Sequence, residues 1–333
     1  MNGPVNDSCP DDSSALQHYE HQTYAIIYSI ILVPGLIGNV LALWVFHVYV
    51  KETKKAVIFM INLAVADLLQ VLSLPLRIYY YLNNSWPFGR GLCMFCFYLK
   101  YVNMYASIFF LVCISVRRCM MVLNPLSYTT CRRRLDRSLC AAGWLFVCLC
   151  CLPFPLLRGG GSDSKCFAEL PVSPVPTWAG LVLMVGAELL GFLLPFGVVG
   201  TCTWLAAGSL RDRHPRVPQD GGEKRRALRM VLSCAGVFLL CFLPYHVTFP
   251  LHWAAKSRWR SSCQFRATVL RCHPVTLCLA SLNCCLDPLM YYFTTEEFRR
   301  RLSRPELPES LHLQRRMSCI TTDDKALPSE LGC

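Results

Sequence analysis

Charge is scarce in this sequence, and that scarcity excludes a soluble globular domain. Only 16% of the 333 residues are Asp, Glu, Lys or Arg. The hydrophobic share is 54%, above the roughly 45–50% of soluble domains, which indicates a chain that lies in lipid. The net charge is +12, but the basic residues are scattered between long apolar runs, so the sequence does not predict a nucleic-acid partner.

Three kinds of signature are also missing. The chain has no HExxH, GxSxG or P-loop motif, which argues against an enzyme of those classes. It shows no two matching halves, which argues against a transporter or channel, although that class stays an alternative. Residues 1–23 are polar and lack the apolar core of a signal peptide, so we expect the first membrane helix to act as its own signal anchor.

Long apolar runs are what the chain does contain. A bilayer core needs about 20 mainly apolar residues per helix. Seven windows satisfy this length, at residues 24–50, 56–82, 90–122, 136–157, 177–208, 226–254 and 265–293. We therefore predict an all-α membrane protein, a seven-transmembrane helix bundle in which most of the 21 Cys are free thiols packed between helices. The predicted parts are an extracellular N-terminus at 1–23, a membrane domain at 24–303 and a disordered cytoplasmic tail at 304–333.

The basic residues predict which side of the membrane each loop occupies. Lys and Arg gather after spans one, three and five and in the tail, as at Lys54, Arg133 and Arg225. By the positive-inside rule these segments are cytoplasmic, and the N-terminus lies outside the plasma membrane. Asn6 and Asn83 begin glycosylation sequons on the side predicted to be external. A short amphipathic eighth helix is expected at residues 294–302, against the inner leaflet.

Short motifs recur along the spans in a fixed order. They are Gly38-Asn39-Val40, Leu63-Ala64-Val65-Ala66-Asp67, Trp144, Pro195, Cys241-Phe242-Leu243-Pro244 and Asp287-Pro288-Leu289-Met290-Tyr291. Through these motifs the chain resembles the rhodopsin-like (class A) G-protein-coupled receptors. The resemblance implies a ligand-activated receptor whose partner is a heterotrimeric G protein.

The resemblance also assigns signalling roles. Arg118 matches the arginine that is expected to engage the G protein, and Arg117 stands where the class has an acidic partner for it. We therefore predict elevated basal signalling, although Arg117 alternatively only adds cytoplasmic positive charge. Pro195 and its counterparts in spans six and seven each remove a helical hydrogen bond and allow a kink. The other residues implied in activation are Phe242, Pro244, Asp287, Pro288 and Tyr291.

Two disulfides and an ion site are further implications of the resemblance. Cys93 and Cys166 are expected to pin the loop between spans four and five over the ligand entrance. Cys9 and Cys263 are expected to tie the N-terminus to span seven. An unpaired charge at membrane depth is costly, so the carboxylate of span two needs a partner. The resemblance allows an allosteric sodium ion there, with a water-filled hydrogen-bond network as the alternative, at Asp67, Asn103, Ser107, Asn283 and Asp287.

The ends of the spans on the external side carry more Lys and Arg than topology requires, which indicates an anionic ligand. Aminergic receptors have an acidic residue at the position of Lys100, so an amine ligand is not expected. The chain is most similar to the purinergic-like branch, and within it to the lysophosphatidylserine receptors, namely the X-linked lymphoid receptor and its sister. This similarity is carried by residues 54–105, by Pro244-Tyr245-His246 and by residues 278–283.

That similarity implies a lysophospholipid ligand, with lysophosphatidylserine as the leading candidate. The expected ligand residues combine cations with aromatic rings and are Tyr24, Arg77, Tyr81, Lys100, Tyr101, Arg158, Phe167 and Lys256. The tyrosines alternatively belong to an interfacial belt or to packing. A nucleotide-activated purinergic receptor is the runner-up, weakened because Phe249 replaces the basic residue expected three positions after His246. An orphan receptor that has lost its ligand is the third possibility.

Overall fold

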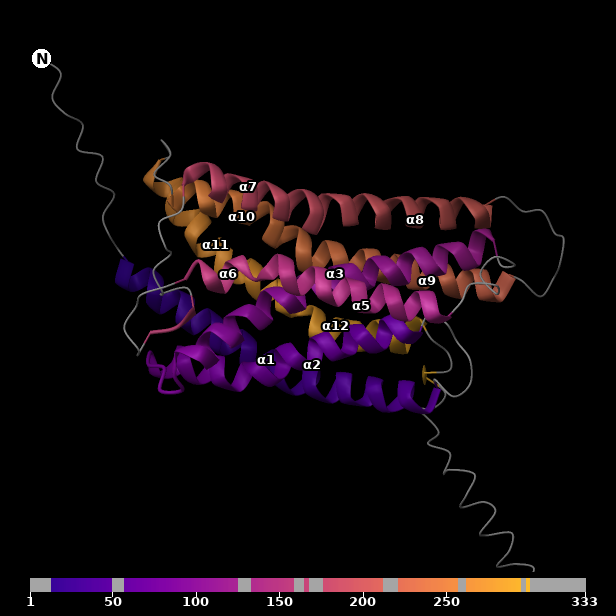
Figure 1. Cartoon of the computed structure of the whole chain (residues 1–333), viewed down its shortest axis with the longest axis horizontal. Coiled ribbons are helices and arrows are strands. Elements are labelled where there is room, and N and C mark those ends of the chain that lie inside the picture. Colours follow the sequence, from indigo (N-terminus) through magenta and orange to yellow (C-terminus); the bar gives the residue numbers. More distant parts are fainter. Residues whose placement is uncertain are drawn as a thin grey trace, which may run out of the picture. The chain divides into compact units, whose positions relative to one another are not determined.

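The computed structural model describes residues 13–49, 57–124, 133–158, 165–167, 176–211, 221–256, 262–294 and 298–299. The chain divides into two units, Met1–Thr295 and Glu296–Cys333, and the helices named here belong to the first. They are α1 (Ser13–Tyr49), α2 (Val57–Asn83), α3 (Arg90–Leu123), α5 (Arg133–Cys151), α6 (Pro153–Leu156), α7 (Thr177–Glu188), α8 (Leu194–Arg211), α9 (Gly221–Val237), α10 (Leu243–Lys256), α11 (Cys263–Ser281) and α12 (Asn283–Thr294) (Figure 1).

Seven helical segments of the described chain are long and apolar enough to cross a membrane, which confirms the predicted seven-transmembrane fold. Helices α1, α2 and α3 are the first three spans, and α5 with the short α6 forms the fourth. Span five consists of α7 and α8, span six of α9 and α10, and span seven of α11 and α12.

The first helix extends beyond its apolar window. That window begins near residue 24 because the preceding residues are polar, whereas α1 starts at Ser13. Residues 13–23 contain neither Pro nor Gly, so nothing in them interrupts a helix. At 37 residues α1 is about 55 Å long, which exceeds the roughly 30 Å of a bilayer core. Polarity thus marks where the apolar surface ends, and the helix continues beyond it.

Spans five, six and seven depart from a regular α-helix on the N-terminal side of their prolines, where kinks were predicted. One π-helical turn, Leu189–Leu193, precedes Pro195, and another, Phe238–Phe242, precedes Pro244. Each proline lacks the N–H that would bond to the carbonyl four residues earlier, and that carbonyl lies inside the π-helical turn. Span seven is interrupted at Leu282, on the N-terminal side of Pro288.

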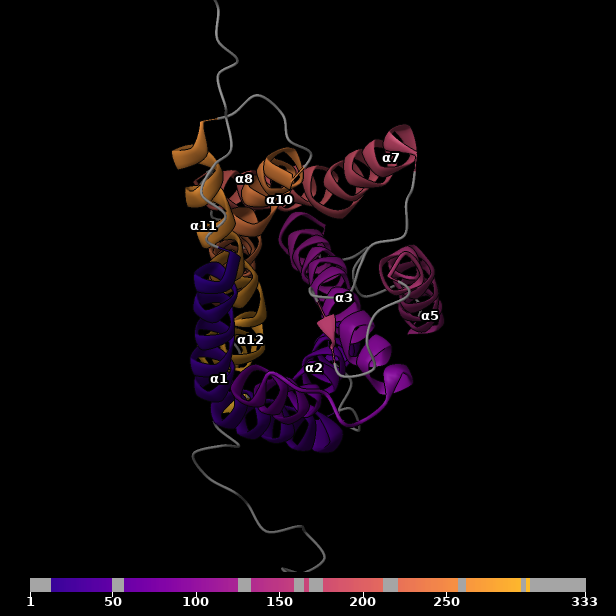
Figure 2. The ribbon, with the colours of Figure 1, turned by 90° about the vertical axis from the view of Figure 1, so that its left-hand side faces the viewer.

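Helix α3 lies in the middle of the bundle, where it contacts α2, α5, α8 and α9 (Figure 2). Polar side chains join neighbouring spans in the apolar interior: Trp144 Nε1 donates to Asn62 Oδ1 at 2.9 Å, and Asn39 Nδ2 donates to the Cys284 carbonyl at 2.7 Å. A Cβ at Gly38 would lie 3.0 Å from the Pro288 ring, so the small residue lets spans one and seven approach closely. These contacts explain several of the sequence motifs as packing devices.

The predicted eighth helix and tail fall largely outside the described residues. Of residues 295–302, Phe298 and Arg299 are described, and both are helical. The tail at 304–333 and the first twelve residues, which include Asn6 and Cys9, lie outside the described ranges.

Candidate functional site

A disulfide marks one end of the bundle. Cys93, near the start of α3, is bonded to Cys166, with a Cα–Cα distance of 5.8 Å. The pairing is the one expected from the resemblance, and the bond anchors the loop segment that follows span four. We call this end the disulfide end, and the opposite end, which holds Arg118, the Arg118 end.

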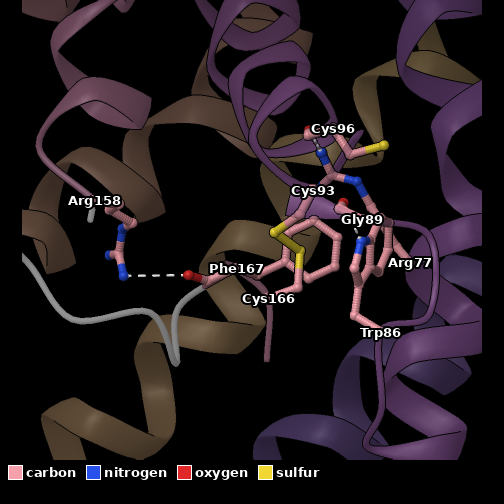
Figure 3. The surroundings of a disulfide bond; sticks show 8 residues. All are labelled: Arg77, Trp86, Gly89, Cys93, Cys96, Arg158, Cys166 and Phe167. Carbon is pink, nitrogen blue, oxygen red and sulfur yellow. Dashed lines mark hydrogen bonds between the residues drawn. A yellow bond between two sulfur atoms is a disulfide. The ribbon is translucent and has the colours of Figure 1, made fainter. Parts of the chain in front are cut away.

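Phe167, the residue after the disulfide, adopts an unusual backbone conformation. Its φ is 58°, in the left-handed region that bulky side chains rarely occupy. Its carbonyl accepts a hydrogen bond from Arg158 Nη1 at 3.2 Å (Figure 3). Its ring stacks on Tyr81, with the ring centroids 5.7 Å apart. The disulfide, the arginine and the stacked ring together hold a conformation that Phe167 would not adopt alone.

Arg77 lies beneath the ring of Phe167. Its guanidinium carbon is 5.2 Å from the ring centroid, and the residue is 0% exposed (Figure 3). Nε donates to Ser73 Oγ at 3.2 Å, and Nη2 donates to the Cys96 carbonyl. Nη1 makes no hydrogen bond to a described residue. A buried donor without a partner is costly, so this nitrogen favours an anionic oxygen brought by another molecule.

The predicted aromatic residues form two groups. Tyr24 stacks on Tyr81 at 4.8 Å, and Tyr81 continues the stack to Phe167, so three of the predicted residues are in contact. Tyr101 belongs to the other group and stacks on Phe154 of α6 at 4.2 Å. Both groups lie inside the bundle near the disulfide, so the rings are packed and are not a belt around the helices.

The two predicted lysines occupy different surroundings. The Lys100 ammonium lies 5.2 Å from the centroid of the Tyr24 ring, whereas Lys256 is exposed at the end of α10. A pocket between α3 and α11 is lined by Lys100, Tyr101, Asn103, Met104, Leu277, Ala280 and Ser281. This pocket joins the predicted ligand residues Lys100 and Tyr101 to Asn103 of the predicted ion site.

The predicted ion site is assembled at mid-bundle by side chains of α2, α3 and α12. Asn103 Nδ2 and Asn283 Nδ2 each donate to Asp67 Oδ1 at 3.1 Å, and Asn283 Nδ2 also donates to Ser107 Oγ at 2.9 Å. Asp67 Oδ2 and both carboxylate oxygens of Asp287 have no hydrogen-bond partner among the described residues. Buried carboxylates without donors need a proton or a cation. These oxygens are compatible with a proton, a sodium ion or a network of waters, so the sodium ion stays a prediction.

Arg117 was predicted to leave Arg118 without its usual acidic partner, with added cytoplasmic charge as the alternative. In the structure it forms a buried ion pair with Asp136 of α5, so it is not merely an added cytoplasmic charge. The two side chains are 8% and 1% exposed. Asp136 lies in another span, so the sequence around Arg117 does not reveal the pair.

The remaining signalling residues lie toward the Arg118 end or in the core. Arg118 is half-buried, and its Nε makes no hydrogen bond to a described residue. Phe242 is buried and meets Phe238 edge to face at 5.8 Å. The Tyr291 hydroxyl donates to the Met60 carbonyl at 3.4 Å, which joins span seven to span two.

Sequence reasoning missed Glu188. His246 entered the sequence argument only as a carrier of the family similarity; in the structure its Nδ1 lies 3.2 Å from Glu188 Oε1, which joins span six to span five. The available signal was an acidic residue inside an otherwise apolar span, which ordinarily marks a functional position.

The other predicted extracellular features are described in part. Cys263 is disulfide-bonded, and its expected partner Cys9 lies outside the described residues. Asn83 is exposed at the end of α2, and its Nδ2 donates to the Tyr79 carbonyl. Asn6 lies outside the described residues.

Comparison with known proteins places this architecture in a family. Residues 38–291 match the model of the 7 transmembrane receptor (rhodopsin family). The chain is 56% identical over 314 residues to "Probable G-protein coupled receptor 174" of Homo sapiens, covering 93% of this chain and 94% of that protein. A Mus musculus protein whose name places it with the purinoceptors is 48% identical over 290 residues, covering 86% of this chain and 88% of that protein. Lysophosphatidic acid receptor 6 of Gallus gallus is 32% identical over 298 residues, covering 88% of this chain and 95% of that protein. The chain therefore belongs to the rhodopsin family of seven-transmembrane receptors, in its purinergic-like and lysophospholipid branch.

Proposed function

We propose that this receptor responds to an anionic lysophospholipid, lysophosphatidylserine in particular, by activating a heterotrimeric G protein. The main support is the pair of arginines at Phe167: Arg77 lies beneath the ring and Arg158 donates to the carbonyl. They come from different spans and approach the same residue, which suits a ligand with more than one acidic group. The membership in a receptor family, and not an enzyme family, agrees with this reading.

The arrangement of polar and aromatic groups supports a lipid with a charged head. Cations of α2, α3 and the end of α6 lie among stacked aromatic rings near the disulfide. A phosphate and a carboxylate on one serine head would together meet this set of cations. Two similar proteins, from Gallus gallus and Homo sapiens, are named as lysophosphatidic acid receptors, which favours a lysophospholipid over a nucleotide. The nucleotide reading stays the runner-up because another relative carries a purinoceptor name.

The proposed orientation places the disulfide end outside the plasma membrane. Lys224, Arg225 and Arg226 of α9 lie at the Arg118 end, and the positive-inside rule assigns that end to the cytoplasm. A G protein would then meet Arg118, and a ligand from outside would meet the site around Phe167.

The test is G-protein activation in receptor-expressing cells exposed to lysophosphatidylserine, lysophosphatidic acid or nucleotides. We expect a response to lysophosphatidylserine that Arg158→Ala weakens about tenfold or more in potency, since a charged hydrogen bond contributes about 1.5–3 kcal/mol. Arg77→Ala is expected to abolish the response, with surface expression measured because the residue is fully buried. Arg90→Ala, an exposed cation at the start of α3, is the matched control and should respond as the wild type. A response to nucleotides alone would contradict the proposal.

A further inference from the structure

Glu188 and His246 form a polar contact between two spans at bilayer depth, outside the residues assigned to ligand or ion. His246 Nδ1 lies 3.2 Å from Glu188 Oε1, and the two side chains are 0% and 17% exposed. When Nδ1 carries the proton, it donates to the carboxylate and leaves Nε2 as the acceptor of the ring. Any displacement of span six relative to span five must lengthen or break this contact.

Both spans are irregular at this place. Glu188 directly precedes the π-helical turn Leu189–Leu193, and the turn Phe238–Phe242 ends four residues before His246. Such turns are frequent at functional positions and allow a helix to change its hydrogen-bond register. The contact therefore bridges the two spans where each of them bends most easily.

Aromatic contacts connect this pair to the core. Phe192 stacks on the His246 ring at 4.6 Å and on Phe238 at 5.5 Å, and Phe238 meets Phe242. Glu188 therefore also influences the position of Phe192, because Phe192 stacks on the imidazole ring that Glu188 contacts. A change at His246 reaches Phe242 through three ring contacts.

Span three completes the group with Tyr105. Its ring lies edge-on to His246, with centroids 6.0 Å apart, and packs so tightly on Gly191 that a Cβ there would lie 2.5 Å from Cε1. The Tyr105 hydroxyl and His246 Nε2 are both buried, and neither bonds to a described residue. Two buried polar atoms on rings that touch each other are thus left without a partner among the described residues.

We propose that Glu188 is a positioning residue of the receptor's switch: it holds His246 against span five in the arrangement seen here, and the Tyr105 hydroxyl becomes the partner of His246 Nε2 in the alternative arrangement. In the present arrangement Nδ1 of the His246 ring contacts Glu188, and in the alternative arrangement Nε2 of the same ring is hydrogen-bonded to Tyr105. The inference rests on coupling to a G protein and is independent of which ligand the receptor binds, because a two-state equilibrium also sets activity without ligand.

The experiment compares basal nucleotide exchange on a G protein in membranes matched for receptor amount. Glu188→Ala removes the contact of the present arrangement, and Tyr105→Phe removes the partner of the alternative one. The two variants must therefore shift basal exchange in opposite directions, each by roughly three- to tenfold, where tenfold corresponds to about 1.4 kcal/mol. Glu188→Gln keeps an oxygen that accepts from Nδ1, so we expect a smaller shift in the same direction as Glu188→Ala.

Tyr98→Phe is the matched control. Tyr98 lies on α3, as Tyr105 does, but its hydroxyl donates to the Cys148 carbonyl at 2.8 Å and takes no part in the contacts of Glu188 and His246. It should leave basal exchange unchanged. Shifts of Glu188→Gln and Tyr105→Phe in the same direction, or no shift in either, would overturn the proposal even if Glu188→Ala fails to fold. The wild-type receptor is measured in parallel. If it stimulates no exchange, the proposed coupling to a G protein has failed; if it does and the variants do not shift as expected, the role of Glu188 is overturned.

Discussion

Arg117 shows how one distant partner changes the meaning of a residue. Its position next to Arg118 suggests an altered cytoplasmic motif. In the structure, the ion pair of Arg117 with Asp136 instead connects helix α3 to helix α5. Its charge is neutralised within the bundle, so it neither restrains Arg118 nor presents a free cation to a G protein. Elevated basal signalling stays a prediction that the ion pair with Asp136 does not test.

We expect Asp136→Asn to destabilise the receptor strongly. Breaking a buried ion pair by removing one partner costs about 3–5 kcal/mol, because the remaining charge is buried without a counter-charge. The double variant Arg117→Asp/Asp136→Arg should recover much of the loss, since it restores opposite charges at the same two positions. Thermal unfolding of the purified receptor in detergent is the measurement, with the exposed Arg137→Ala of the same helix as control. A double variant no more stable than Asp136→Asn would contradict the role given to the pair.

At the scale of elements, glycine determines how closely some spans pack. A Cβ at Gly143 of α5 would lie 2.2 Å from the Phe109 ring of α3, whereas a Cβ at Gly236 of α9 would meet nothing within 4 Å. Both glycines lie within helices, so their effects on backbone entropy are alike.

Gly143→Ala and Gly236→Ala should therefore change stability with opposite signs. The first must displace a packed ring, which costs about 1–3 kcal/mol, and the second gains up to about 1 kcal/mol of helix propensity. Thermal unfolding of both variants checks this. Equal shifts of the unfolding temperature in the two variants would mean that the Phe109 ring can move away from α5 without loss of stability, and would contradict the prediction.

At the scale of the whole bundle, the ion site lies between the disulfide end and the Arg118 end and contacts three spans. If sodium binds one arrangement of the helices more tightly than the other, it must change basal activity and ligand affinity together, since coupling between sites is reciprocal. We expect basal exchange to change when sodium is replaced by N-methylglucamine at equal ionic strength, and Asp67→Asn to remove that dependence. A variant with the wild-type response to sodium would count against an ion at Asp67.

The sequence by itself determined the seven spans, because the length and apolarity of a membrane helix are local properties. The family resemblance also named the residues that gather near Phe167 and around Asp67; the structure brings them together, and their roles stay predictions. The start of α1 at Ser13 could not be read from the apolar window, because apolarity reports contact with lipid, whereas helix continuation depends on backbone preferences.

The tertiary structure alone decided which side chains meet. Asp136 pairs with Arg117, Glu188 with His246, and Arg77 lies beneath Phe167, yet each pair joins residues from separate segments of the chain. The position of a residue along its span, and so its depth in the membrane, can be predicted from the apolar run of that span alone. Which face of a helix packs against which neighbour depends on the packing of all seven spans, because the surrounding helices set the rotation of each helix about its axis.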